Sequence, residues 1–113
     1  MDFAISIENG TAVVKTNVEK LNALNAPGLK AELLQINKQS VNNIVIDMSK
    51  TKYCDSSGLS AILVANRLCK DTNGKFVLCG LQTNVQKLIE IAQLDRVLTI
   101  TSNDIEAIAG IEK

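Results

Sequence analysis

Polar and apolar positions alternate along residues 3–8, and Asn9-Gly10 separates them from residues 11–16, which are expected to form the return strand. Alternation with a period of two predicts half-buried β-strands, and Asn-Gly is a strong two-residue hairpin turn. A β-hairpin therefore opens the predicted fold. Three short apolar runs predict further strands, and the first two are rich enough in β-branched or aromatic residues to be buried on both faces. These runs cover residues 43–48, 75–79 and 97–100.

Four other segments carry apolar residues at helical spacing. Leu29, Leu33 and Ile36 recur at i, i+4 and i+7 and predict an amphipathic helix that begins at Pro27 and ends near Lys38. The remaining three helices are expected over residues 57–71, from the candidate cap Thr83 to residue 92, and from residue 102 or 103 to Ile111.

Strands and helices then follow one another in the order β-β-α-β-α-β-α-β-α. Crossover helices between consecutive strands imply a largely parallel sheet, to which the hairpin adds an antiparallel edge. We therefore expect an α/β fold with a mixed sheet of four or five strands and about four helices. The 113 residues contain no repeat or linker, so residues 1–113 are expected to form a single domain.

Charge and composition exclude several classes of partner. Twelve basic and twelve acidic residues cancel, and no run of five like charges occurs, so we expect no direct binding of nucleic acid. No window approaches the roughly 18–20 apolar residues of a membrane span, so we expect no membrane insertion and a cytoplasmic location.

The residues that most enzymes and metal sites need are scarce. The chain has no histidine, which removes every Ser-His or Cys-His pair, and it has no glycine-rich phosphate-binding motif. The three cysteines, Cys54, Cys69 and Cys79, have no metal-site spacing, and we expect reduced thiols of which Cys54 is the most reactive. We therefore predict no catalytic residue, no cofactor and no metal ligand, and a protein that is not an enzyme.

The most specific segment is Asp55-Ser56-Ser57-Gly58, at the start of the second predicted helix. These residue types also suit a helix cap, which alone accounts for most such tetrads. Ala61, Ile62, Val64, Ala65, Leu68 and Cys69 form one wide apolar face of this helix, whereas Leu59 and Leu63 fall beside polar residues. Either a neighbouring helix covers that leucine pair or a partner protein binds it.

The opening hairpin, the Ile44-Val45-Ile46-Asp47 strand and the helix start Asp-Ser-Ser-Gly-Leu resemble the STAS domain of anti-sigma factor antagonists over essentially the whole chain. The resemblance implies binding to an anti-sigma factor serine kinase, release when Ser57 is phosphorylated, and a phosphoserine phosphatase that restores binding. It implies partner contacts at Asn22, Asp55, Ser56, Ser57, Gly58, Leu59 and Leu63. The alternative is a cytosolic accessory subunit of a membrane lipid-transport ATPase.

Two positions depart from the family pattern. Asn22 follows Leu21 where the family often has aspartate, so either Asn22 fills a turn or the change alters how a kinase or phosphatase recognises the site. Gln93-Leu94 replaces the usual Gly-Leu after the third helix. A residue other than glycine must accept or avoid the left-handed backbone there.

Overall fold

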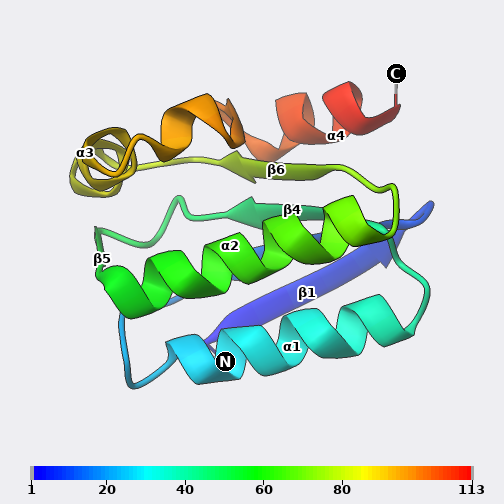
Figure 1. Ribbon diagram of the computed structural model, residues 1–113, viewed down its shortest axis with the longest axis horizontal. Coiled ribbons are helices and arrows are strands. Elements are labelled where there is room, and N and C mark those ends of the chain that lie inside the picture. The colour runs from blue at the N-terminus through cyan, green and yellow to red at the C-terminus, as the bar shows by residue number, and fades with distance from the viewer. Residues whose placement is uncertain (1, 113) are drawn as a thin grey trace.

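The predicted hairpin forms one edge of a five-stranded sheet in the computed structural model, which describes residues 2–112 (Figure 1). Strands β1 (Phe3–Glu8) and β2 (Thr11–Thr16) pair antiparallel. Asn9 and Gly10 both have positive φ, 54° and 76°, as a two-residue turn that matches the twist of the strands requires.

The other strands of this sheet are parallel to β2. They are β4 (Asn43–Asp47), β6 (Phe76–Cys79) and β7 (Thr99–Thr101), and the order across the sheet is β1-β2-β4-β6-β7. The prediction of a mixed sheet with the hairpin at its edge is confirmed. Because β2, β4, β6 and β7 all run in the same direction, their carboxyl ends lie along one edge of the sheet.

Helices cover both faces of the sheet. Helices α1 (Ala26–Lys38) and α2 (Ser56–Asp71) run side by side on one face, and their N-terminal ends lie at the same end of the molecule (Figure 1). Helix α3 (Thr83–Ile91) contributes to the same core, whereas α4 (Asp104–Glu112) packs against β4, β6 and β7 on the other face.

The two faces of each central strand enter different parts of the core. Ile44, Ile46 and Leu78 belong to the larger cluster beneath α1 and α2. Val45 and Val77 belong to a smaller cluster, which also contains Cys79 from β6 and Ala107 and Ile111 from α4. The prediction that β4 and β6 are buried on both faces is therefore confirmed.

Two local predictions are wrong. The strand expected over residues 97–100 begins only at Thr99, because the 3-10 helix η1 (Leu94–Arg96) precedes it and the amides of residues 97 and 98 donate to the Leu94 carbonyl. Thr83 does not cap α3: it is the first helical residue, and Gln82 precedes it without a side-chain cap. Gln93 accepts the left-handed backbone, with φ 60°.

A second, two-stranded sheet was not predicted. Strand β3 (Lys20–Leu21) pairs in parallel with β5 (Tyr53–Cys54), so two segments expected as polar loops are joined. Within residues 2–112, no helix combines the length and the apolar character that crossing a bilayer requires.

Candidate functional site

The small β3–β5 sheet brings together the two loops that carry the candidate residues. Leu21 pairs with Cys54, and the Asp55 amide donates a hydrogen bond to the Leu21 carbonyl at 3.2 Å. Asn22 and Asp55 directly follow the two paired residues. The structure thus places Asn22 beside the start of α2, although the two segments are far apart in sequence.

Buried hydroxyl groups anchor the loop that leads into this site. The Thr51 hydroxyl lies 2.7 Å from the Thr16 hydroxyl and donates to the Val18 carbonyl, also at 2.7 Å. Both threonines are buried, and each polar group finds a partner. Because such bonds join β2 to the chain just before β5, they fix where the Asp55 segment begins.

The first turn of α2 is closed by Asp55. Its carboxylate accepts a hydrogen bond from the Gly58 amide at 3.0 Å, so the capping interpretation of the tetrad holds for Asp55. Ser56 and Ser57 are the first two residues of the helix, where backbone N–H groups have no acceptor within the helix. The serine hydroxyls are therefore not required as caps.

Gly58 is buried, which removes it from the surface that a partner can touch. A Cβ atom at this position would lie 2.5 Å from Cys54 Sγ and 2.7 Å from the Leu21 carbonyl oxygen. The glycine therefore lets α2 approach the β3–β5 sheet closely. Its place in the tetrad is explained by packing, and we drop it from the expected partner contacts.

Asn22 shapes the turn between β3 and α1. Its side-chain oxygen accepts from the Leu24 amide at 3.0 Å, and its carbonyl accepts from the amides of Asn25 and Ala26. Its own amide donates to the Asn25 side chain at 2.9 Å. The geometry fits the turn-filling alternative, and aspartate could accept the same bond from Leu24.

Leu59 and Leu63 are half-buried and pack against the larger core cluster, so the fold covers part of the leucine pair. The opposite face of α2 follows the prediction in part: four of its expected residues are buried and two, Val64 and Leu68, are half-buried. Sequence reasoning missed Leu24, which is 92% exposed in the loop that follows Asn22.

All three thiols are shielded. Burial, followed by the Asp55 carboxylate, raises the pKa of Cys54 to about 12. Burial also raises the pKa of Cys69 to about 11 and that of Cys79 to about 12. Cys54 therefore loses the chemical reason for the higher reactivity expected from its loop position, because the thiolate is the reactive form.

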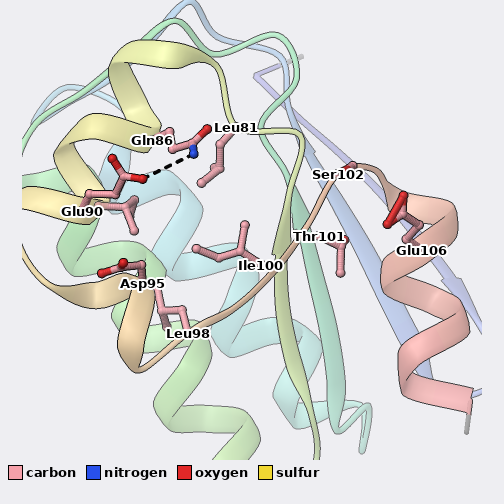
Figure 2. Close-up of a pocket in the computed structure, with 10 residues that line it drawn as sticks. Leu81, Gln86, Glu90, Asp95, Leu98, Ile100, Thr101, Ser102 and Glu106 are labelled. Atoms are coloured by element: carbon pink, nitrogen blue, oxygen red, sulfur yellow. Dashed lines mark hydrogen bonds between the residues drawn. The ribbon is translucent and has the colours of Figure 1, made fainter.

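An open groove adjoins Ser57 between the first turns of α1 and α2, and Lys30 of α1 lines it as well. A larger groove of about 760 Å³ lies elsewhere. Figure 2 shows the side chains that line it, most of which come from α3, η1, β7 and the start of α4. Its carboxylates, Glu90, Asp95 and Glu106, come from three different elements. Among residues 2–112, no group of three or more His, Cys, Asp or Glu side chains is placed to hold a metal ion.

Comparison with known proteins places this geometry in context. Residues 3–107 match the STAS domain. The candidate anti-sigma factor antagonist BtrV of Bordetella bronchiseptica is 29% identical over 93 residues, which cover 82% of this chain and 79% of BtrV.

Solved structures show the same fold. A candidate anti-sigma factor antagonist from Thermotoga maritima superposes with a TM-score of 0.91 at 23% identity, over 98% of this chain and 95% of that one. Two structures of SpoIIAA also superpose, one of the unphosphorylated form and one of the phosphorylated form from Bacillus. The unphosphorylated form superposes with a TM-score of 0.84 at 20% identity, over 97% of this chain and 96% of that one. The phosphorylated form superposes with a TM-score of 0.75 at 18% identity, over 96% of this chain and 98% of that one.

Proposed function

The chain belongs to the STAS domain family, and on that premise we propose that it is an anti-sigma factor antagonist switched by phosphorylation at Ser57. In its unmodified form it binds an anti-sigma factor that is also a serine kinase. Transfer of phosphate to Ser57 ends that binding, and a phosphoserine phosphatase restores it. The activity is regulated binding rather than catalysis by this chain.

The observation that carries the proposal is the position of Ser57 at the second residue of α2, on an open groove. The start of a helix combines a partial positive charge with free N–H groups, and both favour an added oxyanion. The hydroxyl is free of a capping role because Asp55 closes the turn. A phosphate can therefore be added here without removing a bond that holds the helix.

Phosphorylation at this position changes the docking surface rather than the fold. A phosphate carries a charge of about −1.5 to −2, and Ser57 lies two residues from the Asp55 carboxylate. Burying that dianion at an interface adds a large desolvation cost and repulsion from acidic groups of the partner. A few kcal/mol is enough for a roughly 10²–10³-fold loss of affinity.

The partner-facing surface that we propose comprises residues from both loops and from the start of α2. It consists of Asn22, Asp55, Ser56, Ser57, Leu59 and Leu63, together with the exposed Leu24. That SpoIIAA has been solved in a phosphorylated form supports a phosphoserine switch on this fold.

The test is to capture partners from the native cell on tagged wild-type chain and to map phosphate by mass spectrometry after incubation with ATP and the captured kinase. We expect phosphate on Ser57, with Ser56 and Ser60 unmodified. Ser57→Ala should retain the kinase constitutively, and Ser57→Asp should bind it weakly. Phosphate on Ser56, or wild-type affinity of Ser57→Asp, would refute the switch.

Capture of a lipid-transport ATPase without a serine kinase would instead support the alternative accessory-subunit function. In that case Ser57→Asp should have no effect on capture. The Ser56→Ala variant serves as the matched control in both experiments, because it changes the neighbouring hydroxyl and leaves Ser57 intact.

A further inference from the structure

The groove beside Ser57 has an unusual lining. Its volume is about 270 Å³. The chain that leads into α1 and the first turns of α1 supply Ala23, Ala26, Pro27 and Lys30. Helix α2 supplies Ser56, Ser57 and Ser60. Lys30 is the one charged residue among these lining residues, and the others are small or short.

We infer that Lys30 binds the phosphate of phosphorylated Ser57 and acts as its counter-ion across the groove. The inference rests on the proposed function, since it concerns the modified form of the same serine. An ammonium group on a flexible four-carbon stem is a compact point charge that suits a phosphate oxygen. Lys30 reaches the groove from one helix and Ser57 from the other, so the contact joins α1 to α2.

Local charge favours this pairing. The Asp55 carboxylate already occupies the N-terminus of α2, where it accepts from the Gly58 amide. A phosphate on Ser57 places a second anion within the same turn, and the partial charge of the helix end is shared between the two. The cation on the neighbouring helix offsets that excess, while the small lining residues leave room for three added oxygens.

The pairing gives phosphorylation two effects on the surface. It adds an anion beside Asp55, and it neutralises a cation that the unmodified protein presents next to Ser57. A partner whose acidic groups face Lys30 in the unmodified complex therefore loses an attraction at the same time as it meets a new negative charge. The switch is stronger than the charge of the phosphate alone would make it.

The test uses the full chain with phosphoserine inserted at position 57 during translation, and it measures the second pKa of that phosphate by ³¹P NMR. The ordinary value is about 6. Lys30→Met removes the charge and keeps the length of the side chain, so it should raise the measured pKa by about 0.5 or more. Lys30→Arg keeps a cation and should leave the pKa near that of the wild type.

Lys38→Met is the matched control on the same helix. Lys38 lies about 12 Å further along the axis than Lys30, beyond the screening length of roughly 8 Å at physiological salt, so its removal should leave the pKa unchanged. The inference is overturned if Lys30→Met titrates like wild type or if Lys38→Met gives an equal rise. Because no kinase or partner takes part in the titration, its failure would overturn the inference alone, whereas the capture experiment tests the proposed function.

Discussion

The Asp55 carboxylate accepts a hydrogen bond from the Gly58 amide at 3.0 Å, so the residue that precedes both serines closes the first turn of α2. The same tetrad thus separates two tasks. Asp55 stabilises the helix end and Gly58 permits close packing, while the serine side chains between them lie outside both roles.

The cap can be tested by replacing Asp55. Asp55→Ala should lower the free energy of unfolding by about 0.5–2 kcal/mol, because the Gly58 amide loses its acceptor and the helix end loses a favourable anion. Asp55→Ser, which retains a capping oxygen, should recover most of the loss. Urea denaturation measures both, and equal stability of Asp55→Ala and wild type would contradict the assignment.

The close approach at Gly58 predicts a clash. Gly58→Ala should destabilise the protein by about 1–3 kcal/mol, because the new Cβ meets Cys54 Sγ and the Leu21 carbonyl oxygen. Gly110→Ala is the matched control. Within residues 2–112, and apart from the backbone of its own helix and its chain neighbours, no atom lies within 4 Å of its Cβ position in α4, so this substitution should stabilise the protein by about 0.5–1 kcal/mol. Thermal or urea unfolding that ranks the two variants in the opposite order would refute the packing argument.

The elements predicted correctly are those with a local signal. The hairpin follows from the alternation along residues 3–8 and the Asn9-Gly10 turn, and the helices follow from apolar residues at helical spacing that pack on the sheet. The start of the strand predicted over residues 97–100 was wrong, because periodicity cannot place the ends of so short a strand. The left-handed Gln93 and η1 shift its start to Thr99.

The arrangement of the site depended on contacts between distant segments. Strands β3 and β5 have two residues each, too few to show a period, yet they place Asn22 next to Asp55. The tetrad itself predicted the cap, but the burial of Gly58 arises from Leu21, which approaches it in the folded chain only. The position of Lys30 near Ser57 could not be predicted either, because it depends on the packing of α1 against α2, which is a tertiary contact.

The buried hydroxyl pair predicts a local loss of order. Thr51→Val keeps the shape of the side chain but removes the donor to the Val18 carbonyl and the partner of the Thr16 hydroxyl. We expect the free energy of unfolding to fall by about 1–3 kcal/mol and backbone amides in the loop before β5 to exchange hydrogen faster. Thr72→Val removes a hydroxyl that bonds only within its own helix end and serves as the control. Unchanged exchange in the Thr51→Val loop would contradict the anchoring role.

The thiols predict slow labelling and a stability that falls at high pH. At pH 8 all three cysteines should react with a thiol reagent far more slowly in the native protein than in urea, including Cys54. Burial raises each folded-state pKa above the ordinary 9.0, so the unfolded chain loses these protons first. The contribution to stability is therefore complete below pH 9 and is lost as the pH rises towards 11–12. Rapid native labelling of Cys54 would show that its side chain is open to solvent.

Charge at Ser57 should affect folding and binding in opposite directions. Ser57→Asp places an anion at the second residue of α2, where the helix end and Lys30 favour it, so the free energy of unfolding should stay level or rise by up to about 1 kcal/mol. Ser57→Asn introduces a side chain of nearly the same shape as aspartate but without its charge, so the free energy of unfolding should not rise in this variant. The difference between the two variants should shrink in 1 M salt, because screening weakens an exposed charge interaction.

Urea denaturation at low and high salt measures these changes, and kinase capture with the same proteins measures binding. If Ser57→Asp loses both stability and binding while Ser57→Asn keeps both, the weakened binding reflects a damaged fold, and the argument that the switch acts on the surface alone is wrong.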